Sequence, residues 1–459
     1  MTKDSGPFET FIPTSPGDQP VPREIEQERA GEPLTRVRYQ IVLISIAAAF
    51  IMYLDRVCLG EIVKSTSFTS EMQLSKQEIG RFLGAFFFSY ALFQVPAGWL
   101  SDRFGARKML TLYILAWSVM TGLTGLMTTL TGLIVMRLGC GIAQAGAYPT
   151  ISATIRRWIR IDRRGQASSF VSFGGRTGGT VAPYVTALLI FWLVGWRPTL
   201  WLYGLIGVGI AALYWLVVRD QPHEHPRCSP REQDHIGHIP ERKNPRFRDI
   251  LPMLGACCSS PSLWLNSFAQ FCINVGWVFL ITWLPTYLKE AKGLSDTQGA
   301  LMVSIILAMG MVGQPIGGWA TDWSVRTFGL RRGRVLPISL ACLVASIAYL
   351  LCPLMDSAYA IVACLAVVSL MTDIGNPSNW AFMQDVGGKN TAAIFGWGNM
   401  WGNFGASFSS ITLPFVLAFG LQHGWGYAPV FLACSLAFFL AGLCVLGMDA
   451  TKPLVPRGE

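Results

Sequence analysis

Long apolar stretches alternate with short polar ones along most of this chain. Twelve of these stretches have close to the roughly 20 residues that an α-helix needs to cross a lipid bilayer. We predict transmembrane helices at residues 39–60, 78–100, 107–128, 130–154, 165–191, 197–218, 264–288, 297–321, 335–355, 358–384, 391–419 and 425–447. The fold class that follows is an all-α integral membrane protein with twelve transmembrane helices.

The polar segments divide these helices into two sets of six. We expect an N-terminal tail at 1–38, a six-helix bundle at 39–218, a central loop at 219–262, a second six-helix bundle at 263–448 and a C-terminal tail at 449–459. The first 37 residues are polar and Pro-rich, and they lack the apolar segment of a signal peptide.

The composition agrees with a membrane protein. Hydrophobic residues make up 52% of the chain and charged residues 14%, whereas soluble proteins carry about 25% charged residues. A soluble enzyme of several globular domains is therefore excluded. Ten of the 11 cysteines lie in or beside apolar segments, which favours small buried side chains over a disulfide framework.

The net charge of +9 reflects topology. If both termini lie on one side of the membrane, that side holds 27 of the 36 Lys and Arg residues, and the opposite side holds six. The positive-inside rule then predicts cytoplasmic termini in a multi-pass protein of the cell membrane, which is the inner membrane in a Gram-negative organism. Nucleic acid is excluded as a partner. The remaining three basic residues, Arg56, Arg137 and Arg176, lie inside predicted helices.

The chain also repeats itself. Residues 98–108 read GWLSDRFGARK, and residues 318–334, at an offset of 220, read GWATDWSVRTFGLRRGR. Parallel repeats of six helices are typical of carriers that work by alternating access. Both segments resemble the signature loop of the major facilitator superfamily. We expect the polar residues of this loop to govern gating at the cytoplasmic helix ends: Asp102, Arg103, Arg107 and Asp322.

Motifs inside the helices narrow the resemblance. They include Tyr53-Leu54-Asp55-Arg56, Arg137-Leu138-Gly139, Gly174-Gly175-Arg176-Thr177-Gly178-Gly179, Asn379-Trp380-Ala381 and Gly398-Asn399-Met400. Together they resemble the anion:cation symporter family, which includes bacterial hexuronate, glucarate and galactonate carriers, sialin and the vesicular glutamate transporters. The resemblance extends from about residue 39 to residue 447. It implies a transporter and not an enzyme.

The three intramembrane arginines point to an anionic substrate. A charge at bilayer depth costs at least about 2.5–3.5 kcal/mol, so it marks a functional site by default. With a rise of about 1.5 Å per residue, Arg56 and Arg137 share one layer in the outer half of the membrane, and Arg176 reaches the midplane. Arginine binds carboxylates with two parallel hydrogen bonds, so an organic anion is the natural ligand. The alternative is that Arg56 pairs with Asp55, and Arg137 with another helix, purely as structure.

The second half supplies polar and aromatic groups. Asparagine amides can bond sugar hydroxyls, which favours a sugar acid such as a hexuronate or an aldonate; small dicarboxylates and aromatic acids come next. The substrate-binding residues we expect are Tyr53, Arg56, Tyr90, Arg137, Arg176, Trp380 and Asn399.

Proton symport is the expected mode of coupling. Asp55 is an intramembrane carboxylate close to arginines, as a proton relay requires. The family usually carries a Glu seven residues after the arginine of the fourth helix, and here that position is Gln144. Asp373, in the middle of the tenth helix, is the other acid able to take this role. Sodium coupling and uncoupled transport stay open.

Other classes of function have weaker support. The central loop holds His223, His225, Cys228, His235 and His238. Their spacing matches no standard zinc pattern, so we expect a solvated linker, no metal and no cofactor. A non-transporting sensor on the same fold is the remaining alternative. We expect a monomer whose partners are the organic anion, the coupling ion and the lipid bilayer.

Overall fold

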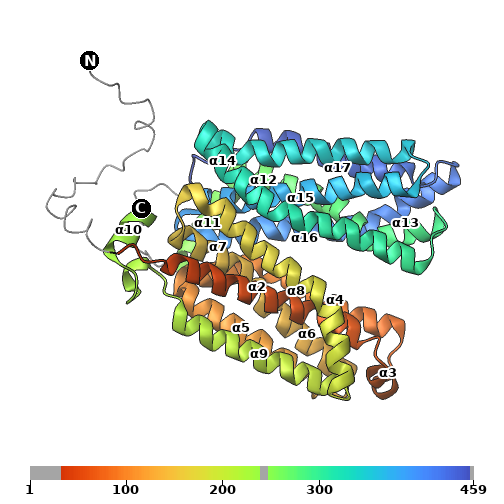
Figure 1. Ribbon diagram of the computed structural model, residues 1–459, viewed down its shortest axis with the longest axis horizontal. Coiled ribbons are helices and arrows are strands. Elements are labelled where there is room, and N and C mark those ends of the chain that lie inside the picture. The colour runs from red at the N-terminus through yellow and green to blue at the C-terminus, as the bar shows by residue number, and fades with distance from the viewer. Residues whose placement is uncertain (1–32, 238–246, 455–459) are drawn as a thin grey trace.

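The computed structural model describes residues 33–237 and 247–454. All regular secondary structure in these two ranges is helical (Figure 1). The outer faces of the helices expose large apolar side chains, among them Phe88, Phe191 and Leu216. So much exposed apolar surface is typical of a face that contacts lipid and not water.

The first half of the chain forms six crossings. They are α2 (Val37–Ile62), α4 (Lys76–Phe104), α5 (Ala106–Thr124), α6 (Leu130–Ala145) continued by α7 (Ala147–Trp158), α8 (Arg164–Trp192) and α9 (Trp196–Val217). A short helix, α3 (Thr66–Met72), lies between the first two crossings.

The second half also forms six. They are α12 (Pro261–Val278) continued by the π-helical turn η4 (Phe279–Trp283) and α13 (Leu284–Glu290), two crossings in α14 (Asp296–Leu351), and then α15 (Ala358–Gly387), α16 (Thr391–Gln422) and α17 (Ala428–Leu446). The backbone of α14 turns at Gly329, whose φ of 77° is a conformation that glycine adopts readily. The described residues therefore make twelve crossings, as the sequence predicts.

Length and hydropathy alone identify eight helical stretches able to span a membrane. Two of them, Leu301–Leu354 and Ala358–Gln422, each contain two crossings. The remaining crossings, α5 and α8, carry more polar residues, including Arg176 on α8.

Equivalent caps begin the second crossing of each half. At α4, Ser75 accepts a hydrogen bond from the backbone of Glu78, whose side chain in turn accepts from the backbone of Ser75. Ser295 and Gln298 form the same capping box at the start of α14. Capping boxes satisfy N–H groups that the first turn of a helix leaves unpaired. The internal repeat thus extends to local structure.

The polar segment between the halves contains two short helices, α10 (Pro230–Ile236) and α11 (Ile250–Ser259). The α10 helix is fastened to the start of α2, because buried Glu232 accepts hydrogen bonds from the backbone of Val37 and Arg38 at 3.0 and 3.1 Å. The same carboxylate pairs with the Arg38 guanidinium at 2.9 Å. This part of the expected linker therefore packs on the first bundle.

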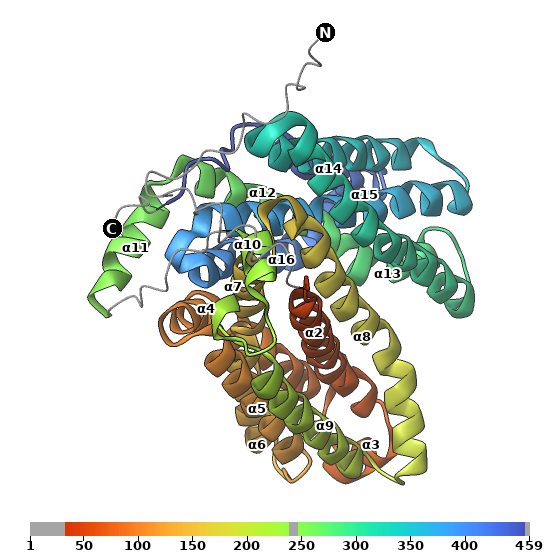
Figure 2. The ribbon, with the colours of Figure 1, turned by 60° about the vertical axis from the view of Figure 1, so that its left-hand side comes forward.

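The two halves lie side by side (Figures 1 and 2). They meet mainly where α4 packs on α16 and where α8 packs on α14. The start of α2, the end of α17 and helices α10 and α11 all lie at one end of the bundle, which we call the terminal side. A functional site shared by both halves has to lie along these two seams.

Candidate functional site

Arg56 lies in an aromatic cage in the first half. Its guanidinium carbon is 4.5–5.0 Å from the ring centroids of Tyr53, Phe86 and Tyr90. Its Nε and Nη2 both donate to Oε1 of Gln144 at 3.3 Å. Stacked aromatic faces stabilise a cation by their quadrupoles. The cage holds the charge in place without a carboxylate.

Asp55 and Arg137 occupy the space behind this cage. Both are buried, and the Arg137 guanidinium carbon lies 4.7 Å from the Phe86 centroid. Within the described residues, neither Asp55 carboxylate oxygen nor the Arg137 Nε has a hydrogen-bond partner. The charged side chain that acts on Asp55 is that of Arg137. No ion pair joins Asp55 to Arg56 in the described ranges, so the alternative of a purely structural Asp55–Arg56 pair is wrong: adjacent helical residues point about 100° apart.

Arg176 pairs with Asp373 across the two halves. Nη2 of Arg176, on α8, donates to Oδ1 of Asp373, on α15, at 2.6 Å. Gln314, on α14, donates to the same oxygen at 2.9 Å. The Arg176 guanidinium carbon also lies 4.3 Å from the ring centroid of Trp277. This pair places a charge contact near the middle of the bundle.

Aromatic rings extend from the Arg56 cage to the second half. Tyr53 and Tyr148 have ring centroids 6.0 Å apart, and Tyr148 meets Trp380 of the second half edge-on at 4.8 Å. The amide of Asn399 donates to the Tyr90 hydroxyl at 3.4 Å. These contacts join five of the seven residues expected to bind substrate: Tyr53, Arg56, Tyr90, Trp380 and Asn399. Of the other two, Arg137 stacks on Phe86 of the cage, and Arg176 stacks on Trp277.

The carboxylates of the repeated loops close the terminal side. The two oxygens of Asp102 accept hydrogen bonds from the backbone of Ala392 and Ala393 at 3.1 and 2.9 Å. The two oxygens of Asp322 accept from the backbone of Gly165 and Gln166, both at 2.9 Å. Each carboxylate thus caps the first turn of a helix in the opposite half, where N–H groups lack helical partners and the helix dipole is positive.

Glycines permit this close approach. A Cβ at Gly98 would lie 2.4 Å from the Ala392 carbonyl oxygen, and one at Gly318 would lie 2.3 Å from the Ser169 hydroxyl. A Cβ atom does not approach other non-bonded heavy atoms this closely. The glycine that opens each repeated segment is therefore required by the contact between the halves.

Asp385 forms ion pairs at this end that the sequence analysis did not predict. Asp385 of α15 pairs with Arg164 at 2.5 Å and with Arg334 at 2.8 Å. The Arg334 Nη2 also donates to the Ile161 carbonyl of the first half at 2.7 Å. Arg164 and Arg334 lie in basic loop motifs, but sequence spacing does not reveal that both pair with Asp385, which is 221 positions from the first and 51 from the second.

The arginines of the first repeated loop contact their own half. Arg107 donates through its backbone to Asp220 at 2.9 Å and stacks over Trp215 at 4.0 Å. The Arg103 guanidinium carbon lies 5.2 and 5.5 Å from the rings of Phe104 and Trp99. Of the four expected gating residues, Asp102 and Asp322 bridge the halves.

The histidines of the central segment are not gathered into a site in the described residues, where no group of three metal-binding side chains occurs. The His225 ring packs edge-on against Trp158 at 5.8 Å, and burial lowers its pKa. Burial likewise raises the pKa of the Cys228 thiol to about 12. His238 lies outside the described ranges.

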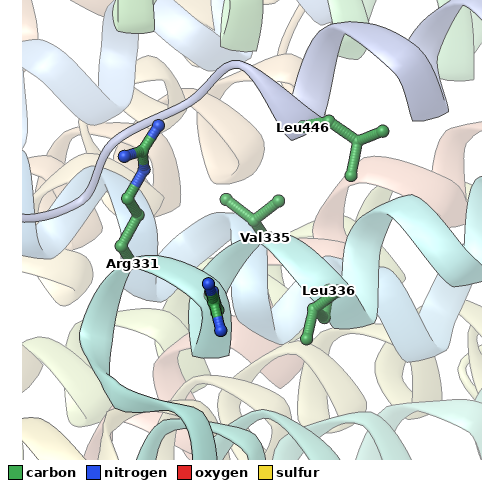
Figure 3. A pocket seen from close by; sticks show the side chains of 5 residues that line it. Arg331, Val335, Leu336 and Leu446 are labelled. Carbon is green, nitrogen blue, oxygen red and sulfur yellow. The ribbon is translucent and has the colours of Figure 1, made fainter.

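A surface pocket of about 390 Å³ lies away from the arginines of the seam (Figure 3). It is lined by Arg331, Arg332, Val335, Leu336 and Leu446. Because these residues belong to α14 and α17 alone, the pocket is a feature of the second bundle and not of the seam between the halves.

Comparison with known proteins gives one consistent result. The Major Facilitator Superfamily profile matches residues 46–410. The chain is 30% identical over 431 residues to the probable sulfoacetate transporter of Cupriavidus necator, covering 91% of this chain and 94% of that protein. It is 28% identical over 445 residues to the probable galactarate/D-glucarate transporter of Escherichia coli K12, covering 92% and 96%.

Solved structures agree on the fold. The crystal structure of the Escherichia coli fucose:proton symporter superposes with a TM-score of 0.67 at 13% identity, covering 89% of this chain and 98% of that one. The human organic anion transporter MFSD10 gives a TM-score of 0.66 at 15% identity, covering 90% and 100%.

Proposed function

The chain belongs to the Major Facilitator Superfamily, and on that premise we propose that it carries an organic anion across the cell membrane by alternating access, in symport with protons. A sugar acid is the favoured substrate. The curated relatives are named for sulfoacetate, for galactarate and D-glucarate, and for D-galactonate. All of these compounds are organic acids, which supports the same class of substrate here.

The observation that carries the proposal is the uncompensated charge of Arg56. Arg137 lies near Asp55, and Arg176 is paired with Asp373, whereas the side-chain partner of Arg56 is the neutral amide of Gln144. Burying a cation without a counter-charge costs free energy. An anionic ligand supplies the missing charge, and Arg56 supplies two or more N–H donors for a carboxylate.

The closure of the terminal side supports alternating access. The two carboxylate caps and the Asp385–Arg164 pair join the halves at that end. Breaking them on one side while forming contacts on the other is how two six-helix repeats expose a central site in turn. We propose that the terminal side is cytoplasmic and that the protein works as a monomer.

Asp55 is the residue we propose to carry the proton. Asp55 is buried, directly precedes Arg56 in the sequence and lies close to Arg137 in space. Both of its carboxylate oxygens lack hydrogen-bond partners in the described residues. Gln144 cannot titrate, and this observation keeps sodium-coupled or uncoupled transport as the second candidate.

The test is uptake by proteoliposomes that contain purified protein. Accumulation of a radiolabelled sugar acid above the external concentration, driven by an imposed pH gradient and abolished by a protonophore, is the expected result. Liposomes with Arg56→Gln protein serve as the matched negative control. Accumulation driven by sodium alone would replace proton symport, and absence of any organic-acid uptake would overturn the substrate class.

A further inference from the structure

The Arg176–Asp373 pair is more than a structural link, because its two members differ in exposure. The Arg176 side chain is 27% exposed, whereas that of Asp373 is 1% exposed. Part of the arginine side chain is therefore open to solvent, whereas the carboxylate is not. Arg176 donates a hydrogen bond to Asp373 through Nη2. An arginine fork has further N–H donors for a second acceptor.

The Asp373 carboxylate is only half satisfied. Its Oδ1 accepts from Arg176 and Gln314, but its Oδ2 has no partner among the described residues. The buried Ser369 hydroxyl lacks a partner as well, and a Cβ on Gly310 would lie 2.5 Å from both oxygens. A buried carboxylate oxygen without a hydrogen-bond partner lacks an interaction that stabilises its charge, and this favours binding of a proton there.

Arg56 and Arg176 flank the same pair of tyrosines. The guanidinium carbon of Arg56 lies 4.8 Å from the Tyr53 centroid. The residue before Arg176 is Gly175, where a Cβ would lie 2.4 Å from the Tyr148 hydroxyl and 3.1 Å from the Tyr53 ring. Tyr53 and Tyr148 both interact electrostatically with Arg56 and with Arg176, so the two guanidiniums lie near the same two rings.

The charges of this region can be balanced in two ways. With Asp55 and Asp373 ionised, the three arginines leave one positive charge, which one acid group neutralises. With a proton on Asp373, two positive charges remain, at Arg56 and Arg176. An acid with two negative groups then restores neutrality. In the second arrangement, a carboxylate of the substrate replaces that of Asp373 as the counter-charge of Arg176.

Resting on the proposed function of organic-anion transport, we propose that this site takes an acid with two acid groups, one at Arg56 and one at Arg176. Asp373 stands in for the second group while the site is empty. When the substrate takes Arg176, a proton from solvent binds Asp373. The groups that face Asp373 are Arg176 from α8, the neutral Gln314 from α14 and Ser369 on its own helix. Among sugar acids, the inference selects those oxidised at both ends of the carbon chain.

The test compares two ligands with the same six-carbon skeleton. Galactarate carries a carboxylate where D-galactonate carries a terminal hydroxyl. Wild-type protein is expected to bind galactarate about tenfold or more tightly than D-galactonate, as a charge-assisted hydrogen bond implies. A series of linear dicarboxylates and their monomethyl esters extends the comparison to other lengths.

The informative variant, Arg176→Gln with Asp373→Asn, removes both charges of the pair at once, and the expected result is that galactarate and D-galactonate bind with equal affinity. Arg197→Gln, which alters a pair with Glu71 outside this region, is the matched control and is expected to keep the preference. A double variant that still prefers the two-acid ligands would overturn the proposal.

Calorimetry on the wild-type protein gives an independent readout if the double variant does not fold. In buffers of different ionisation enthalpy, galactarate is expected to take up one more proton on binding than D-galactonate does. Equal proton uptake would remove Asp373 from the proposal. Suppose that the wild type binds one-acid and two-acid ligands with equal affinity, and that Arg56→Gln abolishes the binding of both kinds of ligand. The two-acid inference then fails, whereas the proposal of organic-anion transport stands. If no acid in the series binds, both fail.

Discussion

The guanidinium of Arg56 faces the side-chain amide of Gln144, with both Nε and Nη2 donating to Oε1 at 3.3 Å. The other end of the amide donates to the Met52 carbonyl at the same distance. The amide is therefore oriented by α2 so that its oxygen points at the arginine. An acid at this position would present a carboxylate to the same two donors.

Replacing Gln144 by Glu is expected to lower the affinity for substrate at neutral pH. The new carboxylate would pair with Arg56 and compete with the substrate for its donors. Lowering the pH should restore binding, because protonation of the glutamate releases the arginine. The measurement is the dissociation constant as a function of pH, with Gln144→Asn as the control. A variant with wild-type affinity at every pH would show that substrate does not use Arg56.

Arg137→Lys is expected to abolish uptake while the protein still folds. Lysine keeps the charge but does not reproduce the planar fork of arginine or its stacking on the Phe86 ring. The loss in affinity should be at least about tenfold. Arg81→Lys, at an exposed position of α4, is the control. Near-normal uptake by the Arg137 variant would exclude this residue from the site.

Asp55→Asn is expected to abolish uphill accumulation driven by a pH gradient and to retain exchange of substrate for substrate. A neutral amide does not carry a proton, and the arginines that bind the anion remain. The neighbouring Arg137 loses its counter-charge, so the apparent affinity for the anion should rise. Uptake and exchange in proteoliposomes distinguish these effects, and Asp356→Asn, on an exposed loop, is the control. Retained uphill accumulation would assign the proton to another group.

Asp102→Asn and Asp322→Asn are expected to slow net transport without changing the affinity for substrate. An asparagine oxygen accepts one of the two backbone hydrogen bonds, but its NH₂ group faces the second N–H. The closed terminal side should lose about 1.5–3 kcal/mol of stability for each bond to a charged group. Asp162→Asn, whose partner Arg160 lies in its own loop, is the control. A complete loss of ligand-induced thermal stabilisation would contradict a role confined to gating.

Glu232→Ala is expected to destabilise the first bundle by about 3–5 kcal/mol, the range found when one partner of a buried ion pair is removed. The buried carboxylate accepts from the backbone of α2, from Thr35 and from Arg38, and all of these donors would be left unpaired. Thermal unfolding measures the effect. Glu61→Gln, in an exposed pair with Lys64, should have almost none. Equal melting temperatures for both variants would mean that α10 is not fastened to α2.

The twelve crossings and the family were predictable from the sequence, because the length of an apolar run and the spacing of a motif are local properties. The profile match and the relatives confirm the resemblance to anion carriers of this superfamily. Depth arithmetic also placed Arg176 at the midplane. It did not find Asp373 as its partner, because the two residues are 197 positions apart and meet only when the halves pack.

The same limit explains the other omissions. Glu232 reads as one more charge in a polar segment, and only the fold shows that it caps a transmembrane helix. Asp55 and Arg56 are adjacent in sequence, and a structural pair between them is the alternative that the sequence leaves open. The helix directs them to different neighbours, Asp55 towards Arg137 and Arg56 towards Gln144. Adjacency in the sequence therefore predicts which side chains pair less well than does the side of the helix on which each residue lies.

The reciprocal caps of Asp102 and Asp322 give the seam the symmetry of a homodimer. Each half donates one carboxylate and receives one, as in an isologous interface where the same patch serves both subunits. Each set of six helices therefore carries both features of the gate, a carboxylate and a helix start that the carboxylate of the other half caps. An ancestral six-helix chain that paired with a copy of itself would already have had two matching latches, before any duplication joined them in one polypeptide.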